Sequence, residues 1–185
     1  MADCDHIIEQ IDLPQWSKLV RYFTVWHVVR TDSSEYALEM IDGVEHSAVC
    51  KPFYLTNAAD VCLRHNRASQ AREYMEIGLE GIASSQERWW EPELYRMRGI
   101  VSKAQNDSAF KVGQDFSRAL SIATEREAHA LALRAATCYA ELKADNGEVT
   151  KAVDLLEPHF QKVAQGGNCA DLDHAQRLLD NWSCQ

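Results

Sequence analysis

Two Cys/His pairs come nearest to metal-binding chemistry in this sequence: Cys62 with His65, and Cys169 with His174. Thiolates and imidazoles are zinc ligands, and residues three apart share one face of a helix. Each pair supplies only two ligands, whereas a structural zinc site takes four, and His65 falls where a helix is expected to end. The sequence therefore predicts no metal site, and Cys62 and Cys138 are interpreted as small apolar residues of the core.

Acidic residues and glycines raise the question of nucleotide chemistry. Asp171 and Asp173 have the residue type that binds the metal of a nucleotide cyclase, but they lie at an expected helix start, where the helix dipole favours carboxylates. A phosphate-binding loop needs glycines followed by Lys and Ser or Thr, and the chain has no Gly-Lys dipeptide. Gly166-Gly167 is interpreted as a helix terminator. We therefore expect no cofactor, no catalytic residue and no enzymatic activity.

Composition indicates which kinds of molecule this protein is not expected to bind. The 185 residues carry a formal net charge of -9, with Lys and Arg scattered singly, so we expect no direct binding to nucleic acid or to an anionic membrane. The apolar window at 19–29 is interrupted by Arg21 and His27 and is too short to span a bilayer. The six cysteines form no Cys-x-x-Cys pair and the N-terminus does not resemble a signal peptide, which together predict a cytoplasmic location.

The elements that must position these residues are predicted to be helices throughout. Pro14 suits the first turn of a helix, and Asn146-Gly147 suits a turn with positive φ. No segment alternates like a strand. We expect a single domain over 1–185. Its parts are an N-terminal segment 1–12, a degenerate first helix pair 13–50, a second pair 53–86, a third pair 90–124, a fourth pair 127–165 and a capping helix 171–182.

A pattern of small and large apolar residues recurs in the second helix of each pair, at intervals of roughly 34 to 41 residues. Helix pairs of that length stack because one pair cannot bury its apolar face alone. The pattern predicts an all-α, right-handed α-solenoid of about four helix pairs plus the capping helix. Its positions are Ala37, Ile41 and Val44; Ala71, Met75 and Gly78; Val112, Phe116 and Ala119; and Ala152, Leu156 and His159.

Five stretches carry a resemblance to a known family: ERWWEPELYRMRG at 87–99, FSRALSIA at 116–123, LRAAT at 133–137, LLEP at 155–158, and residues 171–180. Residues 53–182 resemble the tetratricopeptide (TPR) array at the C-terminal end of bacterial signal-transduction ATPase regulators. Those regulators carry a winged-helix DNA-binding domain or an adenylate/guanylate cyclase domain upstream of the array. We expect these upstream domains to be absent here, so the resemblance implies only the sensing or docking role of the repeats.

The resemblance also implies where a partner binds. In TPR arrays the first helix of each pair lines the concave face, so its residues outside the core are candidate contacts. Among these, the Arg96 guanidinium could form a fork to a peptide carboxylate. A solvated charged surface is the alternative interpretation, and Trp89 and Trp90 fill a seam between repeats or project into the groove. By position, the candidate partner-binding residues are Thr56, Asp60, Glu93, Arg96, Lys103 and His129.

The sequence thus predicts a non-enzymatic protein–protein interaction module with a protein or peptide ligand, acting in bacterial signalling or transcriptional regulation. One alternative is a separately encoded regulatory arm of an adenylate/guanylate cyclase or signal-transduction ATPase. Another is a remnant of a larger gene. Trp16, Phe23 and Trp26 form an apolar stripe near the N-terminus for which no cap is apparent. Either the N-terminal segment 1–12 folds back over this stripe, or a second copy covers it in a homodimer through the N-terminal end.

Overall fold

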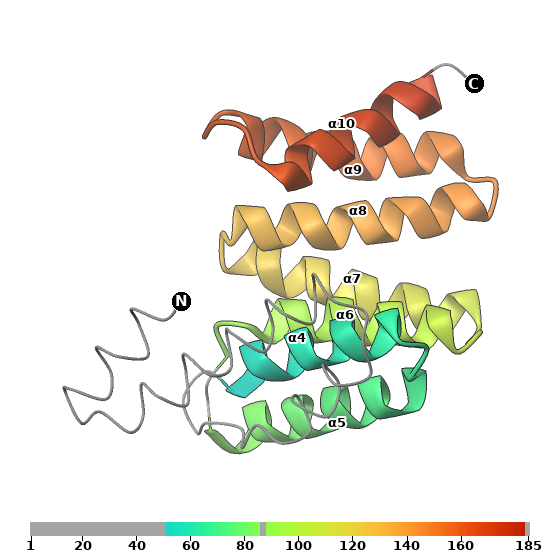
Figure 1. The fold of residues 1–185 in the computed structure, drawn as a ribbon. Coiled ribbons are helices and arrows are strands. Elements are labelled where there is room, and N and C mark those ends of the chain that lie inside the picture. The colour runs from blue at the N-terminus through green and yellow to red at the C-terminus, as the bar shows by residue number, and fades with distance from the viewer. Residues whose placement is uncertain (1–50, 86–87, 184–185) are drawn as a thin grey trace, which may run out of the picture. The chain divides into compact units, whose positions relative to one another are not determined.

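The computed structural model describes residues 51–85 and 88–183 of the chain, which form seven α-helices and no strand (Figure 1). The all-α prediction is therefore confirmed for these residues. Several predictions lie outside them: the N-terminal segment 1–12, the degenerate pair 13–50 with Ala37, Ile41 and Val44, and the apolar stripe at the N-terminus.

The chain divides into two compact units, Met1–Glu87 and Arg88–Gln185. The described part of the first unit is a helical hairpin of α4 (Lys51–Arg64) and α5 (Ala68–Ser85). These helices fall within two residues of the expected bounds of the second pair, and α4 begins two residues early, at Lys51, with Pro52 in its first turn. The prediction of one domain over 1–185 stays a prediction.

The second unit contains five helices, which match the third pair, the fourth pair and the closing helix expected from the sequence. Ser108 caps the helix that begins at Ala109, because its Oγ accepts a hydrogen bond from the Lys111 backbone N–H at 3.4 Å. The closing helix begins one residue before Asp171, which therefore lies in its first turn. The helices are α6 (Glu91–Ala104), α7 (Ala109–Glu125), α8 (His129–Asp145), α9 (Val149–Ala164) and α10 (Ala170–Ser183).

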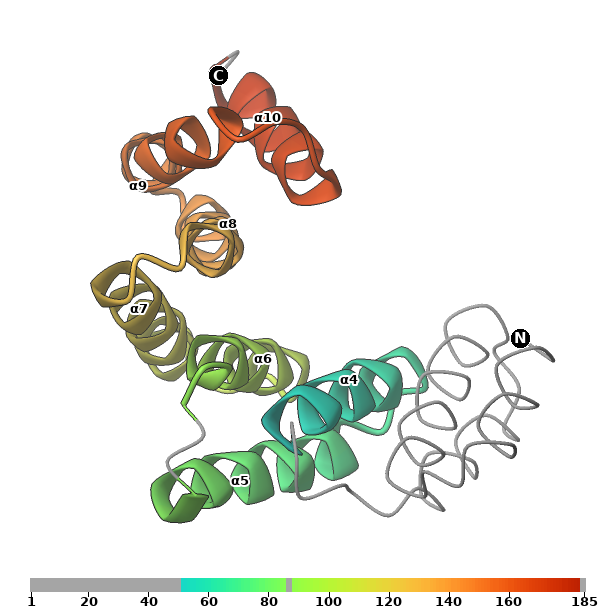
Figure 2. The ribbon, with the colours of Figure 1, turned by 90° about the vertical axis from the view of Figure 1, so that its left-hand side faces the viewer.

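Within the second unit, the first helices of the pairs, α6 and α8, lie with α10 on one side, and the second helices, α7 and α9, lie on the other (Figure 2). Each helix packs against the next in the chain, and α8 also contacts both α6 and α10. As a result α6, α8 and α10 form one surface, which we call the first-helix face, while α7 and α9 form the other side. Alternating first and second helices in this way is the arrangement expected of a helix-pair repeat.

The recurring apolar positions account for the core. Ala71, Met75, Ala119 and Leu156 are fully buried, and the remaining predicted positions of α5, α7 and α9 are buried as well, except for the half-buried His159. Small residues in this set let neighbouring helices approach each other. The spacing seen in the sequence therefore identifies the faces that pack in α5, α7 and α9.

One glycine is required by a close approach between α6 and α7. A Cβ atom built on Gly99 would lie 2.5 Å from the ring of Phe116, which is buried at 2% exposure. That distance is far below van der Waals contact, so the Phe116 ring occupies the space that a side chain at position 99 would need.

The turns between helices share one construction. Asn66, Asn106, Glu127 and Gly147 each have positive φ, and the residue that follows donates its N–H to a carbonyl five residues earlier. This is the backbone bond of a Schellman motif, which satisfies carbonyls at the helix end. The positive φ predicted for Asn146-Gly147 is confirmed at the glycine, with φ of 80°.

Candidate protein-interaction surface

A buried ion pair on α6 lies beside α8. Glu93 and Arg96 are one turn apart in α6, and their exposed fractions are 3% and 8%. Arg96 Nε donates to Glu93 Oε2 at 2.8 Å, and its Nη2 donates to Oε1 at 2.6 Å. The guanidinium therefore makes its fork to a carboxylate of its own helix, in the bidentate geometry that makes such pairs strong.

Arg134 of α8 extends this pair across the surface. Its Nη1 lies 2.8 Å from Glu93 Oε1, and its Nε lies 3.8 Å from Asp171 Oδ2 in α10. Glu93, Arg134 and Asp171 thus connect α6, α8 and α10 in one line. About a third of the Arg134 side chain is exposed, so this line runs from the buried centre toward solvent.

The surroundings of the pair favour its charged form. Burial alone would raise the pKa of Glu93, but the charge and hydrogen bonds of Arg96 and the charge of Arg134 outweigh it and hold that pKa below its usual value. Burial opposes the charge on Arg96 in the same way, and Glu93 nevertheless raises the pKa of Arg96.

Cys138 of α8 lies beside the pair, with its Sγ 3.5 Å from Arg96 Nη1. Burial raises the pKa of the Cys138 thiol even though the neighbouring Arg96 charge acts to lower it. A thiol with a raised pKa is a poor nucleophile at neutral pH. Cys138 therefore has a packing role beside the ion pair, in keeping with its interpretation as a small residue of the core.

Two further polar contacts between side chains cross the same face at its edges. Lys103 Nζ in α6 lies 2.7 Å from Asp145 Oδ2 in α8, and both side chains are more than half exposed. His174 Nε2 in α10 lies 3.2 Å from Glu141 Oε1 in α8, again with partly exposed side chains. Exposed pairs of this kind contribute between zero and about 1 kcal/mol. Their groups can change partner at little cost.

The predicted contact residues fall into two groups. Glu93, Arg96 and Lys103 lie together on α6, and His129 is exposed at the first position of α8. Thr56 and Asp60 belong to α4 in the other unit. Glu93 and Arg96 are buried and bound to each other, and Thr56 is buried with its hydroxyl donating to the Phe53 carbonyl at 2.9 Å. Asp60 pairs with Arg64 at 3.1 Å.

Sequence reasoning missed the residues that connect the first helices. Arg134, Asp145 and Glu141 were not singled out, and Asp171 and His174 were considered only as a helix start and a partner of Cys169. One signal was present: Lys103 and Asp145 are separated by about one repeat length, and so are Glu93 and Arg134. Opposite charges at that separation on consecutive first helices meet when the repeats stack.

The aromatic residues before α6 are only partly covered. Trp89 is 48% exposed, and its ring lies 5.0 Å from that of Trp90, centroid to centroid. The Tyr95 ring is covered by the guanidinium groups of Arg98 at 4.9 Å and Arg118 at 5.9 Å. Tyr95 therefore makes cation–π contacts on the surface of its own unit.

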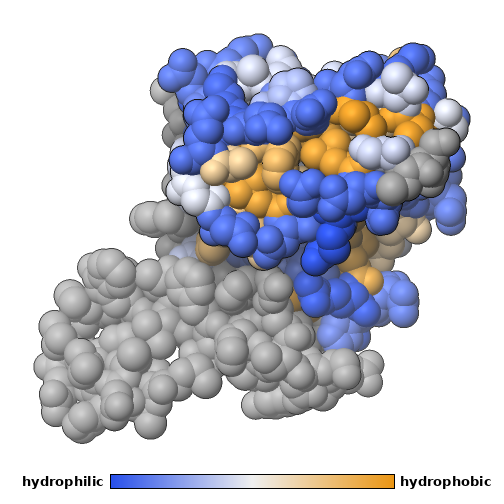
Figure 3. Space-filling model, turned by 90° about the horizontal axis from the view of Figure 1, so that it is seen from above, coloured by the Kyte–Doolittle hydropathy of each residue, from blue (hydrophilic) through white to orange (hydrophobic). Residues whose placement is uncertain are grey.

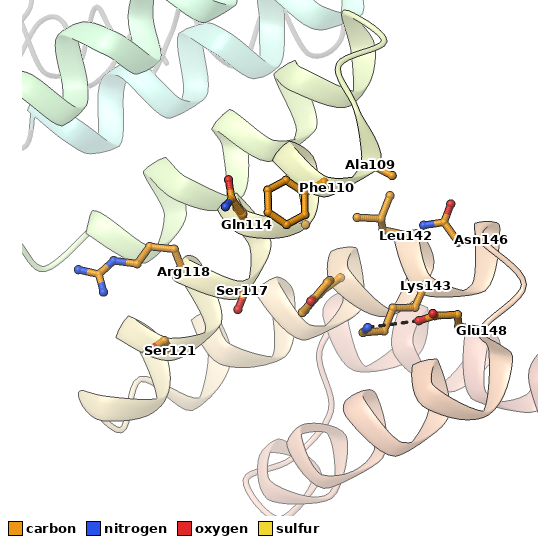
Figure 4. A pocket seen from close by; sticks show the side chains of 12 residues that line it. Ala109, Phe110, Gln114, Ser117, Arg118, Ser121, Leu142, Lys143, Asn146 and Glu148 are labelled. Atoms are coloured by element: carbon orange, nitrogen blue, oxygen red, sulfur yellow. Dashed lines mark hydrogen bonds and ion pairs between the residues drawn. The ribbon is translucent and has the colours of Figure 1, made fainter.

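An open hollow of about 710 Å³ lies between α7 and α8 (Figure 4). Phe110, which is 75% exposed, stands at its edge, and Tyr139 and Leu142 form its apolar part. Lys143 lies 4.7 Å from the Tyr139 ring and 3.5 Å from Glu148, and these contacts use its charge within the protein. The hollow is a shallow mixed surface between two repeats.

Metal and membrane chemistry find no support in the described ranges. No three His, Cys, Asp or Glu residues at 51–85 and 88–183 lie close enough together to hold a metal ion. Cys62 is fully buried and Cys169 is exposed. Over the same residues, no helix combines the length and the apolar character needed to cross a bilayer.

Comparison with known proteins identifies the fold. No protein-family model and no curated protein matches the chain. Among solved structures, it is similar to the TPR-like repeats of a kinesin light chain from Podosopora anserina, with a TM-score of 0.66, 15% identity and coverage of 88% of this chain and 83% of that one. A single-substitution variant of the same protein gives a TM-score of 0.67 with the same identity and coverage. The prediction of a TPR-like α-solenoid is confirmed.

Proposed function

We propose that this chain is a non-catalytic protein-interaction module that binds a protein or peptide through its first-helix face. Repeat solenoids present extended surfaces suited to such ligands. On this face, ion pairs that run from one first helix to the next bring charged groups of both signs together. An extended peptide offers backbone and side-chain groups that can pair with both signs.

The exposed pair of Lys103 and Asp145 is the observation that supports this proposal best. Both side chains are more than half exposed. A ligand carboxylate can replace Asp145 at Lys103 with little loss of stability, because exposed pairs are weak. The same exchange at Arg96 would leave Glu93 buried with one cation fewer, and breaking a buried pair costs on the order of 3 to 5 kcal/mol.

The predicted contacts therefore take different roles in the proposal. Lys103 and His129 contact the ligand directly, since both are exposed at the ends of first helices. Glu93 and Arg96 hold Arg134 in place, and Arg134 presents the partly exposed guanidinium. Thr56 and Asp60 belong to the first unit and are not part of this face; Thr56 is buried there.

The test compares two lysines that differ in face and match in exposure. Lys103 on α6 and Lys111 on α7 are each 51% exposed, and each pairs with an aspartate. Immobilised wild type, Lys103→Glu and Lys111→Glu are used to capture proteins from native-host lysate, followed by mass spectrometry. We expect Lys111→Glu to retain a partner that Lys103→Glu loses. Equal capture by all three would contradict binding at the first-helix face.

A narrower form of the proposal places the module in bacterial signalling or transcriptional regulation, as the resemblance of residues 53–182 implies. In the rival form, the chain is a regulatory arm of a cyclase or signal-transduction ATPase, without catalytic residues of its own. The identity of the captured protein distinguishes them. A partner that contains a nucleotide cyclase or ATPase domain favours the rival, and a partner bound through a short segment favours the adaptor.

A further inference from the structure

The α9/α10 side of the second unit carries a second surface, apart from the first-helix face. Two adjoining hollows of about 190 Å³ and about 320 Å³ lie between these helices and share Phe160 and Gln176. Together they form one groove, which we call the α9/α10 groove. Figure 3 shows this side of the molecule, where hydrophobic residues form a streak bordered by hydrophilic ones.

The groove is lined by one stripe from each helix. Val153, Glu157, Phe160 and Ala164 recur at helical spacing along α9. From α10 come Leu172, Asp173, Gln176, Leu179, Asp180 and Ser183, at the same spacing. Each stripe covers three turns, or about 16 Å of helix. The groove therefore has the length of a short helical segment.

The floor of the groove is part polar and part apolar, and its apolar part is incompletely covered. Phe160 and Val153 are half-buried, and both pack against the core cluster that contains Leu156, Leu172 and Leu179. In a solenoid, helices pack on one another through surfaces of this kind. An apolar surface bordered by polar residues is typical of an interaction site.

The border of the groove is acidic. Glu157 contributes from α9, and Asp173 and Asp180 contribute from α10, so carboxylates stand on both sides. All three are exposed, and no Lys or Arg among the described residues pairs with them. Asp180 accepts one hydrogen bond, from Gln176 at 2.8 Å. None of the lysines and arginines of α9 and α10 lines the groove.

We propose that the α9/α10 groove binds a basic amphipathic helix of a partner protein. Apolar residues of that helix at positions i, i+3 or i+4, and i+7 would cover Phe160, as in other helix-in-groove complexes. Lys or Arg on its flanks would pair with Glu157, Asp173 and Asp180. A second copy of this chain fits poorly, because a two-fold contact would bring the same carboxylates together in a chain of net charge -9.

The binding test uses a designed probe. A fluorescent peptide of about 14 residues, long enough for the groove, carries leucines on one face and lysines and arginines beside them. Its matched control has glutamate at each basic position. Fluorescence anisotropy with the full chain at low salt should show saturable binding of the basic peptide and none of the acidic one. Equal binding of both peptides, or no binding of the basic one, overturns the proposal.

Charge reversal locates the site. In the double variant Glu157→Lys/Asp180→Lys we expect affinity for the basic peptide to fall by about tenfold or more, since both borders become repulsive. The double variant Glu125→Lys/Glu127→Lys has the same net charge and changes exposed residues at the end of α7 and in the turn after it, which do not line the groove. It should bind within about twofold of wild type, because its loss is limited to long-range attraction. An equal loss in both double variants overturns the assignment to this groove.

Further measurements distinguish the proposed ligand from a second copy of the chain, and binding in this groove from binding at the first-helix face. Circular dichroism should show both double variants folded, because surface charge changes alter stability by little. Lys103→Glu should bind the basic peptide as wild type does, whatever its effect on captured partners. If light scattering shows a wild-type dimer that Phe160→Ser converts to a monomer, a second copy covers the groove and the proposal is wrong.

Discussion

The Glu93 carboxylate is almost fully buried and forms ion pairs with two guanidinium groups, those of Arg96 and Arg134. A carboxyl whose pKa is lowered on folding stabilises the native state while it is ionised. That contribution is fully present above its ordinary pKa of 4.5 and is lost as the pH falls through the lower pKa of the folded state. The contribution of this ion pair to stability should therefore decrease at acidic pH.

We predict that Glu93→Gln lowers the melting temperature most at neutral pH. The variant leaves Arg96 buried without its carboxylate, and such broken pairs cost on the order of 3 to 5 kcal/mol. The difference from wild type should stay constant from pH 7 to about 5 and shrink below pH 4.5, because the unfolded wild type then binds a proton at Glu93 that the folded protein does not. Thermal melts of both proteins across this range measure it.

Asp154→Asn serves as the control, because Asp154 is exposed on α9. Its difference from wild type should be small at every pH. A Glu93→Gln difference that is independent of pH between 7 and 3 would show that the carboxylate of Glu93 is not stabilised by its neighbours.

Glu127 supports a second prediction at this scale. Its φ of 55° lies in the left-handed region, where a residue with a side chain is disfavoured by about 1 kcal/mol relative to glycine. We expect Glu127→Gly to stabilise the protein by about 0.5 to 1 kcal/mol, measured by chemical denaturation. Glu125→Gly, two residues earlier at the end of α7, should destabilise it by a similar amount, since glycine is a poor helix former. The two variants should change the free energy of unfolding in opposite directions. If both lower it, the turn geometry at Glu127 is contradicted.

Individual residues were the hardest features to predict from sequence. Glu93 and Arg96 are one turn apart on a helix, a spacing that pairs opposite charges, so their ion pair was readable. Their burial was not, because it depends on how closely α8 approaches α6. The fork expected for a ligand at Arg96 is consequently made to Glu93.

At the scale of the element, helices were predictable because their signals are local. Polar turns and apolar periodicity gave the bounds of α4 to α9 to within a few residues. The sequence placed the start of α10 at Asp171, because an aspartate suits a helix start. The helix begins one residue earlier, at Ala170. The packing of one helix on another was predictable only where small residues recur at the same position of each pair.

The contact between Gly99 and Phe116 gives the prediction for this scale. We expect Gly99→Ala to destabilise the protein by about 1 to 3 kcal/mol, because the new methyl group overpacks a buried ring. This loss outweighs the gain of about 1 kcal/mol that alanine brings to a helix. Melting temperature and denaturant midpoint measure the change.

Gly113→Ala on α7 is the matched control. A Cβ atom there would meet Leu142 at 3.5 Å and Tyr139 at 3.6 Å, which is ordinary contact. The same substitution should therefore be neutral or stabilising at position 113. If both alanine variants gain stability, α6 and α7 do not approach each other as described.

At the scale of the whole molecule, the fold was predictable and the ligand was not. Repeat spacing constrains how helices stack, and that constraint holds for any ligand. The surfaces left exposed depend on side chains such as Lys103 and Glu157, whose charge is visible in the sequence but whose neighbours come from other helices. For this reason the α9/α10 groove had no counterpart in the sequence analysis.

Nucleotides should not bind. The chain has no glycine-rich loop followed by lysine, so nothing in its sequence provides a phosphate cradle. Purified protein should keep its melting temperature in millimolar ATP or GTP with magnesium. A saturable rise of several degrees would contradict the non-enzymatic assignment.

Self-association through the N-terminal end stays a prediction. The apolar stripe of Trp16, Phe23 and Trp26 lies outside the described residues, and a two-fold dimer is the commonest way to cover such a surface. Light scattering at tens of micromolar should give a mass that rises with concentration and falls when Phe23→Ser is introduced. A constant monomer mass would contradict it.

The packing of each helix against its neighbours in the chain has a consequence for folding speed. In the second unit nearly all helix contacts join segments within one repeat length, so little loop entropy is lost before contacts form. Such topologies fold quickly, and parts of them open independently. Among the described residues, α10 packs less extensively on α8 and α9 than α8 packs on its own neighbours. The amides of α10 should therefore exchange with solvent deuterium before those of α8, and a helix bound in the α9/α10 groove should slow that exchange.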